Sequence, residues 1–150
     1  MGYYLIGNSD LDDTATLGVM QLMERPDYSS LVRILEEMNK EGAFTASVLA
    51  RDDGFLIASA VSATTHPDVV AAMSGYVADT VERMRNELGL GNLKDISVRC
   101  SEGKAVFRKI ASQRKQGLIL AAIMPRKIRY HARPVGKATT LIRKILGYRK

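Results

Sequence analysis

The sequence predicts an α+β fold in which helices flank an antiparallel five-stranded sheet. Three segments carry apolar residues at steps of three and four, as on one face of a helix. Between them lie short runs rich in strand-forming residues, two pairs of which are joined by an acidic residue followed by glycine. The last run, "GLILAAIM", is apolar without alternation, which is typical of a central strand buried on both faces. The predicted order is α-β-β-α-β-β-β-α.

The first helix is expected from Asp27 to Gly42, with Asp27 or Ser29 as its cap. Its apolar positions follow the helical period: Leu31, Ile34, Leu35 and Met38. Glycine is typical of a helix C-terminus, so Gly42 is the expected end.

Two strands follow, Phe44 to Arg51 and Phe55 to Ser62, with Asp52-Asp53-Gly54 between them. Asp-Gly between apolar strands indicates a hairpin, because tight turns need a positive φ that Gly and Asp tolerate. The adjacent carboxylates could also suggest a calcium site or an acid/base pair. Calcium loops spread their oxygen ligands over a longer spacing, and paired-carboxylate catalysis needs acids placed around a substrate. We therefore interpret the tripeptide as a turn.

The second helix is expected to begin near Thr65, a candidate cap, and to close at Gly89. Pro67 and Asp68 suit its first turn, since proline needs no amide partner there and a carboxylate favours the positive end of the helix dipole. His66 could serve as a general base, but no nucleophile can be assigned beside it, so a helix-start role is the simpler interpretation.

This helix is apolar on more than one side. One stripe consists of Val70, Met73, Val77, Val81, Met84 and Leu88. A series of small residues, Ala71, Gly75 and Ala78, lies beside it. Glycine inside a helix costs about 1 kcal/mol relative to alanine, so Gly75 indicates a close packing partner. We expect the sheet on one side and a second copy of the helix on the other, although the small residues could instead lie on the helix's own sheet. The predicted dimer or partner face is Val70, Ala71, Ser74, Gly75, Ala78, Val81 and Glu82.

The remaining strands are predicted at Lys94 to Ser101, Lys104 to Ser112 and Gly117 to Met124, with Glu102-Gly103 as a two-residue turn. Apolar Ile96, Val98 and Cys100 alternate with polar residues, which predicts one buried face. Cys100 is accordingly expected to be an inert core thiol, and as the single cysteine it can form no internal disulfide.

The C-terminal third is strongly basic. Residues 103–150 contain fourteen bases and no acid, whereas residues 1–102 contain all sixteen acids and eight bases. After Pro125 comes the connector "RKIRYHAR", followed by an amphipathic helix expected from Pro134 to Leu146 and stopped by Gly147. A block of one charge sign commonly meets an anionic surface. The candidate anion-binding residues are Arg126, Lys127, Arg129, Arg133 and Lys137, with His131 among them.

Length and composition favour one domain, with 46% apolar residues among 150. We expect a mobile lead-in over residues 1–26, a core domain over 27–124, and a basic connector with a packed helix over 125–150. The start of the chain shows no secretory or lipidation signal, and cysteine is scarce, so we expect a cytoplasmic protein.

The order and spacing of these segments resemble a known family. The segment "LVRILEEMNKEGAFTASVLARDDGFLIASAVS", the helix end "ELGLGNLKDISVRC" and the run "GKAVFRKIASQRKQGLILAAIMP" resemble the roadblock (dynein light chain) family over about residues 28–124. None of these motifs is catalytic, so the resemblance depends on their succession.

The resemblance implies a roadblock/profilin-like α-β sandwich whose five-stranded sheet has the last strand at its centre. It also implies that two copies pair through the second helix and the neighbouring edge strand. Prokaryotic members are associated with small Ras-like GTPases, and some stimulate GTP hydrolysis by repositioning the GTPase's own residues. No catalytic residue, cofactor or metal ligand is therefore carried over to this chain.

The sequence predicts a non-enzymatic, homodimeric regulator or scaffold of a small Ras-like GTPase. The chain is not expected to be the GTPase itself, because it has no G-x-x-x-x-G-K-[ST] motif and the glycines of "ELGLGNL" follow a helix. The alternative is a nucleic-acid- or anionic-membrane-binding module that acts through the basic C-terminal third.

Overall fold

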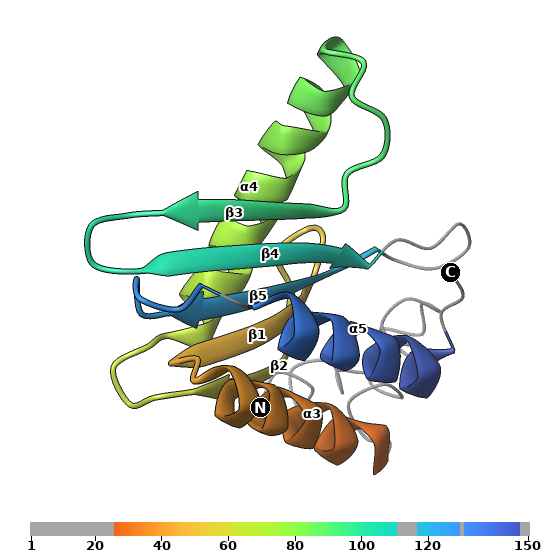
Figure 1. Cartoon of the computed structure of the whole chain (residues 1–150). Helices are drawn as coiled ribbons and strands as arrows, with labels where there is room; N and C mark the ends of the chain where they lie inside the picture. Colours follow the sequence, from red (N-terminus) through yellow and green to blue (C-terminus); the bar gives the residue numbers. More distant parts are fainter. Residues whose placement is uncertain (1–25, 111–116, 130, 148–150) are drawn as a thin grey trace.

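The computed structural model describes residues 26–110, 117–129 and 131–147 (Figure 1). Three helices and five strands follow one another in the predicted order. They are α3 (Pro26–Gly42), β1 (Ala46–Arg51), β2 (Leu56–Val61), α4 (Pro67–Glu87), β3 (Asp95–Arg99), β4 (Lys104–Ile110), β5 (Leu118–Met124) and α5 (Ala132–Leu146). The predicted lead-in lies outside the described residues, apart from Pro26, which begins α3.

The five strands form one antiparallel sheet in the order β2-β1-β5-β4-β3. The prediction that the "GLILAAIM" strand is central is confirmed, since β5 pairs with β1 on one side and with β4 on the other. Six of its seven residues are buried, which is why the run lacks an alternation of polar and apolar residues.

Each face of the sheet is covered by different helices. Helices α3 and α5 lie side by side on one face, and α4 crosses the other (Figure 1). The core under α3 and α5 includes Leu35, Leu49, Leu120 and Ile142. The core under α4 is made of smaller residues, with Phe107 as its large member; they are Val48, Ala50, Ala71, Ala78, Phe107, Ile119 and Ala121. Because side chains alternate along a strand, even-numbered β4 residues from Lys104 to Ile110 belong to the α5 face and Phe107 to the α4 face.

The helix ends differ from prediction at several points. The N-cap of α4 is His66 and not Thr65, and the His66 side chain makes no capping hydrogen bond. The Thr65 hydroxyl instead lies 3.3 Å from that of Ser62. At the other end Gly89 takes the expected left-handed conformation with φ of 64°. Helix α5 begins two residues before Pro134, and Gly147 ends it with φ of 71°.

The second hairpin turns one residue earlier than predicted. The amide of Cys100 donates to the carbonyl of Gly103 at 2.8 Å, so Ser101 and Glu102 form the tip. Gly103 is therefore the last residue before β4, and a Cβ there would stand 3.3 Å from the carbonyl oxygen of Met124.

The predicted burial of the β3 apolar side is wrong. Ile96 is half-buried, Val98 is 40% exposed and Cys100 is exposed, so Cys100 is not a core thiol. The reason is that β3 is an edge strand and α4 packs mainly on β1, β2 and β5. The alternation correctly separates two sides of the strand, but this side is left largely uncovered by the described chain.

Candidate functional site

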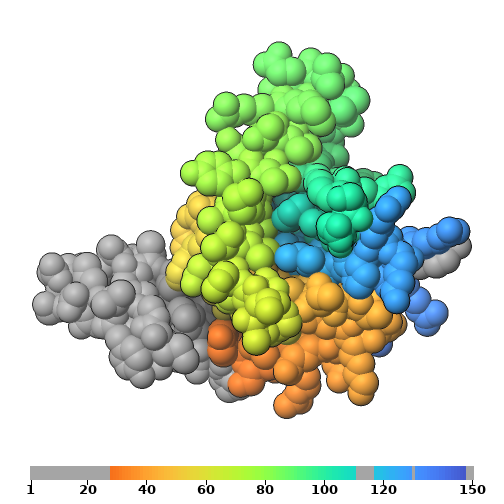
Figure 2. Space-filling view, turned by 90° about the vertical axis from the view of Figure 1, so that its left-hand side faces the viewer, coloured from red at the N-terminus to blue at the C-terminus, as the bar shows by residue number. Residues whose placement is uncertain are grey.

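The outer face of α4 carries large apolar side chains that the described part of the chain leaves exposed. We call it the α4 outer face, and its members are Val69 (58% exposed), Met73 (55%), Tyr76 (74%), Met84 (48%) and Leu88 (63%). Their spacing of three, four and eight residues places them along one side of the helix. Figure 2 shows α4 running up this side of the molecule and projecting beyond the sheet. Contiguous exposed apolar surface of this kind marks association sites.

The small-residue side of α4 packs on its own sheet, which corrects part of the predicted partner face. Ala71 and Ser74 are 0% exposed, Ala78 is 5% exposed, and Gly75 is buried. These four residues are therefore not available to a second chain. The other predicted members, Val70, Val81 and Glu82, are half-buried along the flanks of the helix.

Gly75 is small because the first hairpin presses against it. A Cβ at Gly75 would stand 3.0 Å from the amide nitrogen and 3.2 Å from the Cα of Gly54. The predicted close packing partner is thus backbone of the same chain, the tip of the β1–β2 hairpin, and not a second helix. Gly54 itself has φ of 93°, a conformation that favours glycine.

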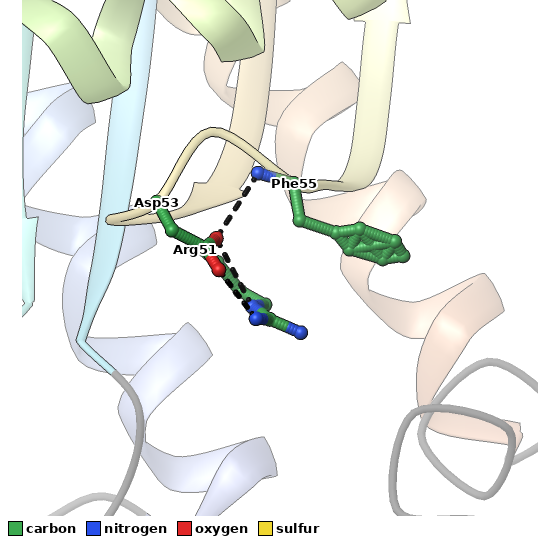
Figure 3. A network of polar contacts seen from close by, with 3 residues as sticks. All are labelled: Arg51, Asp53 and Phe55. Atoms are coloured by element: carbon green, nitrogen blue, oxygen red, sulfur yellow. Dashed lines mark hydrogen bonds and ion pairs between the residues drawn. The ribbon is translucent and has the colours of Figure 1, made fainter. Parts of the chain in front are cut away.

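The hairpin tip uses the carboxylate of Asp53 to hold the turn. The amide of Gly54 donates to the carbonyl of Arg51 at 2.9 Å, and Asp53 Oδ1 accepts from the amide of Phe55 at 3.3 Å. The guanidinium of Arg51 lies 2.5 Å from Asp53 Oδ2 and 5.1 Å from the centre of the Phe55 ring (Figure 3). The interpretation of Asp52-Asp53-Gly54 as a turn is confirmed by the strand pairing on either side. In the described part of the chain no three potential ligand residues are grouped as a metal site would require.

A charged network joins α4 to β4 beside this tip. Glu82 pairs with Lys109 of β4 and, at 2.7 Å, with Arg85 one turn along the helix. The hydrogen bond from Lys109, followed by that from Arg85, lowers the pKa of Glu82 below its ordinary value, against the opposing effect of burial. Glu82 and Lys109 line an open hollow of about 690 Å³ between the hairpin tip and the helix. The side chain of Glu82 is only 27% exposed, and its pair with Lys109 links α4 to the sheet.

The structure brings together three of the five predicted anion-binding residues. Arg126, Lys127 and Arg129 lie in the connector and line a second open hollow with Ser97, Arg99, Lys104 and Ile128. Arg133 is exposed on the first turn of α5 and lies outside this lining. Lys137 lies at the groove between α5 and α3, 3.9 Å from the carboxylate of Glu41.

Sequence reasoning missed the strand contribution to this hollow. Arg99 and Lys104 are directly opposite each other across the β3–β4 pair, and Ser97 lies two residues along on the same side. The sequence does show that Ser97 and Arg99 share one side of β3, because the polar residues of this strand alternate with its apolar ones. The missing information was that the connector after β5 returns to this end of the sheet.

His131 lies at the start of α5, close to β3 and β4. Burial, and then the nearby ammonium of Lys104, lower the pKa of His131 below its ordinary value; Arg108 acts in the same direction and Asp95 opposes them. Its Nδ1 is buried without a hydrogen-bond partner among the described residues. His131 is therefore a partly buried residue of the described structure.

None of the helices within residues 26–110, 117–129 and 131–147 is both long and apolar enough to cross a membrane. No family model matches the chain. Among curated proteins it is similar to the uncharacterized protein MJ0310 of Methanocaldococcus jannaschii, with 30% identity over 75 residues. That match covers 50% of this chain and 66% of the relative.

The architecture defines an α+β sandwich with two helices on one face and a single, half-exposed helix on the other. The same arrangement occurs in MglB of Myxococcus xanthus, with a TM-score of 0.72 and 12% identity over 81% of this chain and 98% of that one. It occurs also in a roadblock/LC7 domain of Streptomyces avermitilis, with a TM-score of 0.70 and 15% identity over 77% and 97% of the two chains. Another similar structure, with a TM-score of 0.70 and 14% identity, shows MglB in a tetrameric arrangement; it covers 81% of this chain and 90% of that one.

The chain therefore has the same fold as MglB and the roadblock/LC7 domain, and the fold inferred from the sequence is confirmed. At these identities the likeness establishes the fold alone.

Proposed function

We propose that the protein is a homodimeric roadblock protein that binds a small Ras-like GTPase and regulates or scaffolds it, with no catalytic residue of its own. The observation that carries the proposal is the α4 outer face, because it presents large apolar side chains to solvent on a roadblock fold. The self-association seen in the MglB tetramer supports the use of this fold as an assembly module.

The edge of the sheet supports a particular mode of pairing. β3 ends the order of the described strands, so within the described sheet one side of its backbone has no strand partner, and α4 projects past it (Figure 1). A two-fold axis at this edge would pair β3 with its copy and α4 with its copy. Such pairing would cover Met84, Leu88 and Val98 together, which are three of the large apolar residues that are exposed in one copy.

The GTPase part of the proposal comes from the resemblance of the chain to the roadblock family, whose prokaryotic members are associated with such GTPases. A protein in this role presents a rigid surface and leaves the chemistry to its partner, which agrees with a hairpin tip where the carboxylate of Asp53 holds a turn. A small-GTPase partner also implies a cytoplasmic location.

The dimer is tested by light scattering at micromolar concentration. We expect a dimer for the wild-type chain and a folded monomer for Tyr76→Glu, since a charge at this 74%-exposed position would be desolvated on pairing. Asn86→Glu, which adds the same charge at an exposed position on another side of α4, should remain a dimer. A wild-type monomer would contradict the dimer claim.

The partner is tested by capture followed by reconstitution. The wild-type chain and Tyr76→Glu are used as baits in native extract, and a protein retained by the wild type alone is identified and purified. GTP hydrolysis by that protein is then measured with and without the chain. Faster hydrolysis indicates regulation, binding with an unchanged rate indicates scaffolding, and the absence of any GTPase among the retained proteins would overturn the proposal.

A further inference from the structure

The hollow at the start of β4 concentrates positive charge on the face of the sheet opposite α4. Its lining contains five cationic side chains, from Arg99, Lys104, Arg126, Lys127 and Arg129, together with the hydroxyl of Ser97 and with Ile128. No acidic residue is among the lining residues. The hollow is open and measures about 730 Å³, within the size range of small-ligand sites. We call it the basic hollow.

Pairing within the sheet forces two of these cations together. Arg99 and Lys104 are directly opposite each other in the β3–β4 ladder. Like charges at opposed positions destabilise a strand pair. Within the described part of the chain, none of the five cations of the basic hollow forms an ion pair, whereas the neighbouring Arg108 pairs with Asp95 at 3.3 Å. The repulsion is therefore left without a counter-ion from the described protein.

Lys104 is the most informative member, because it is only 8% exposed. Its ammonium has three protons to donate, and the one hydrogen bond described for it is to the carbonyl of Ile128 at 3.3 Å. Burial of an ammonium without a negative partner is unfavourable. An anion bound in the basic hollow would supply that partner.

The start of α5 adds further positive potential nearby. His131 lies close enough to Lys104 for the ammonium to help lower the pKa of the imidazole. The first turn of α5 contains no acid, and its N-cap makes no side-chain hydrogen bond. A helix N-terminus without such compensation favours a negative charge.

We propose that the basic hollow binds a phosphate-bearing anion with at least two adjacent phosphate groups. Five cations in one concave site exceed what one carboxylate or one phosphate can neutralise, and arginine forks match phosphate oxygens two at a time. Concavity favours a compact anion over an extended duplex. The site lies on the other face of the sheet from α4, so it does not rest on the proposed GTPase role.

Calorimetric titration of the full chain with sodium tripolyphosphate tests the proposal. We expect saturable binding of one equivalent per chain that weakens as salt rises, since released counter-ions make phosphate contacts salt-dependent. Orthophosphate should bind at least about tenfold more weakly, because it engages fewer of the cations. Absence of saturable binding, or equal affinity for both anions, would overturn the proposal.

Substitutions test whether tripolyphosphate binding depends on the basic hollow or on the overall positive charge of the chain. Arg126→Gln, at an exposed position, should weaken tripolyphosphate binding about tenfold while leaving the fold intact. Lys104→Met should do the same, and its circular dichroism shows whether loss of the buried ammonium also affects folding. Lys137→Gln removes an equal charge from the α3–α5 groove and should leave binding unchanged. Equal losses in Arg126→Gln and Lys137→Gln would overturn the assignment to this hollow.

Further binding experiments distinguish a lipid headgroup from a soluble ligand as the natural source of the phosphates. Vesicles of phosphatidylcholine, with and without a phosphatidylinositol phosphate, are sedimented with the wild-type chain and with Arg126→Gln. Phosphoinositide-dependent sedimentation that Arg126→Gln removes indicates a lipid headgroup, and binding to free tripolyphosphate alone indicates a soluble ligand. Duplex DNA binding that tripolyphosphate fails to displace would contradict a compact phosphate site.

Discussion

At the residue scale, Gly75 shows how a close backbone approach constrains side-chain size. Its missing Cβ leaves room for the amide of Gly54, and the three atoms nearest to that Cβ position are all backbone atoms. Alanine would gain about 1 kcal/mol from helix propensity but would force the hairpin tip away from α4. The steric effect should win because backbone moves less readily than a flexible side chain.

We therefore expect Gly75→Ala to destabilise the protein by about 1 kcal/mol, measured as the free energy of unfolding in urea. Gly136→Ala is the matched control, since it is also helical and a Cβ there meets no atom within 4 Å. It should stabilise the protein by about 0.5 to 1 kcal/mol. If both substitutions stabilised the protein, helix propensity and not the hairpin contact would decide the effect at Gly75.

His131 gives the molecule a pH dependence near neutrality. Burial and Lys104 lower the pKa of His131 in the folded chain, with Arg108 acting in the same direction and Asp95 against it. The unfolded chain consequently takes up the proton first as pH falls through about 6.5, so the folded state loses stability on acidification. His131→Gln should reduce the loss of stability between about pH 7.5 and pH 5.5, measured by urea unfolding at each pH. An unchanged difference between the two pH values would show that His131 does not titrate abnormally.

At the element scale, the attachment of α4 to β4 depends on Glu82. Its carboxylate accepts from Lys109 and Arg85, and all three side chains are at least two-thirds buried. Glu82→Gln should destabilise the protein by about 1 to 2 kcal/mol, because it leaves two partly buried cations without their counter-ion. The lowered pKa of Glu82 places its acid-linked loss of stability below about pH 4.5, a window separate from that of His131.

The control for Glu82 is another acid on the same helix. Asp79 pairs with Arg83 at 3.0 Å, but both side chains are more than 60% exposed. Asp79→Asn should change the free energy of unfolding by less than about 0.5 kcal/mol, as is usual for exposed pairs. A larger effect for Asp79→Asn than for Glu82→Gln would contradict the role given to the buried network.

The elements also show where sequence reasoning succeeds and where it stops. Strand β5 could be predicted as central because burial on both faces removes alternation from its own residues. The sequence could show that α4 is apolar on two sides. It could not show which of these sides packs on the sheet, because that depends on the close approach of Gly54 to Gly75. The exposure of Cys100 could not be predicted either, because alternation shows which residues share a side and not what covers it.

Only part of the basic hollow could likewise be predicted from the sequence. Arg126, Lys127 and Arg129 stand in one segment, so their charge is evident in the sequence. Arg99 and Lys104 join them through strand register and through the return of the connector to β3 and β4, which are tertiary facts. Conversely, Arg133 and Lys137 are near in sequence but lie outside the lining, because α5 carries them away along its axis.

At the scale of the whole molecule, one face of the sheet is covered by two helices and the other by a helix that leaves its outer side to solvent. If the α4 outer face is covered in a dimer, association must stabilise the fold by mass action. The midpoint of thermal unfolding should then rise with protein concentration for the wild-type chain and for Asn86→Glu. Tyr76→Glu should unfold at a lower temperature that does not depend on protein concentration, because a variant that stays monomeric is not stabilised by association. Differential scanning calorimetry over a wide concentration range measures both trends, and a concentration-independent wild-type midpoint would show that the α4 outer face is not an interface between copies of this chain.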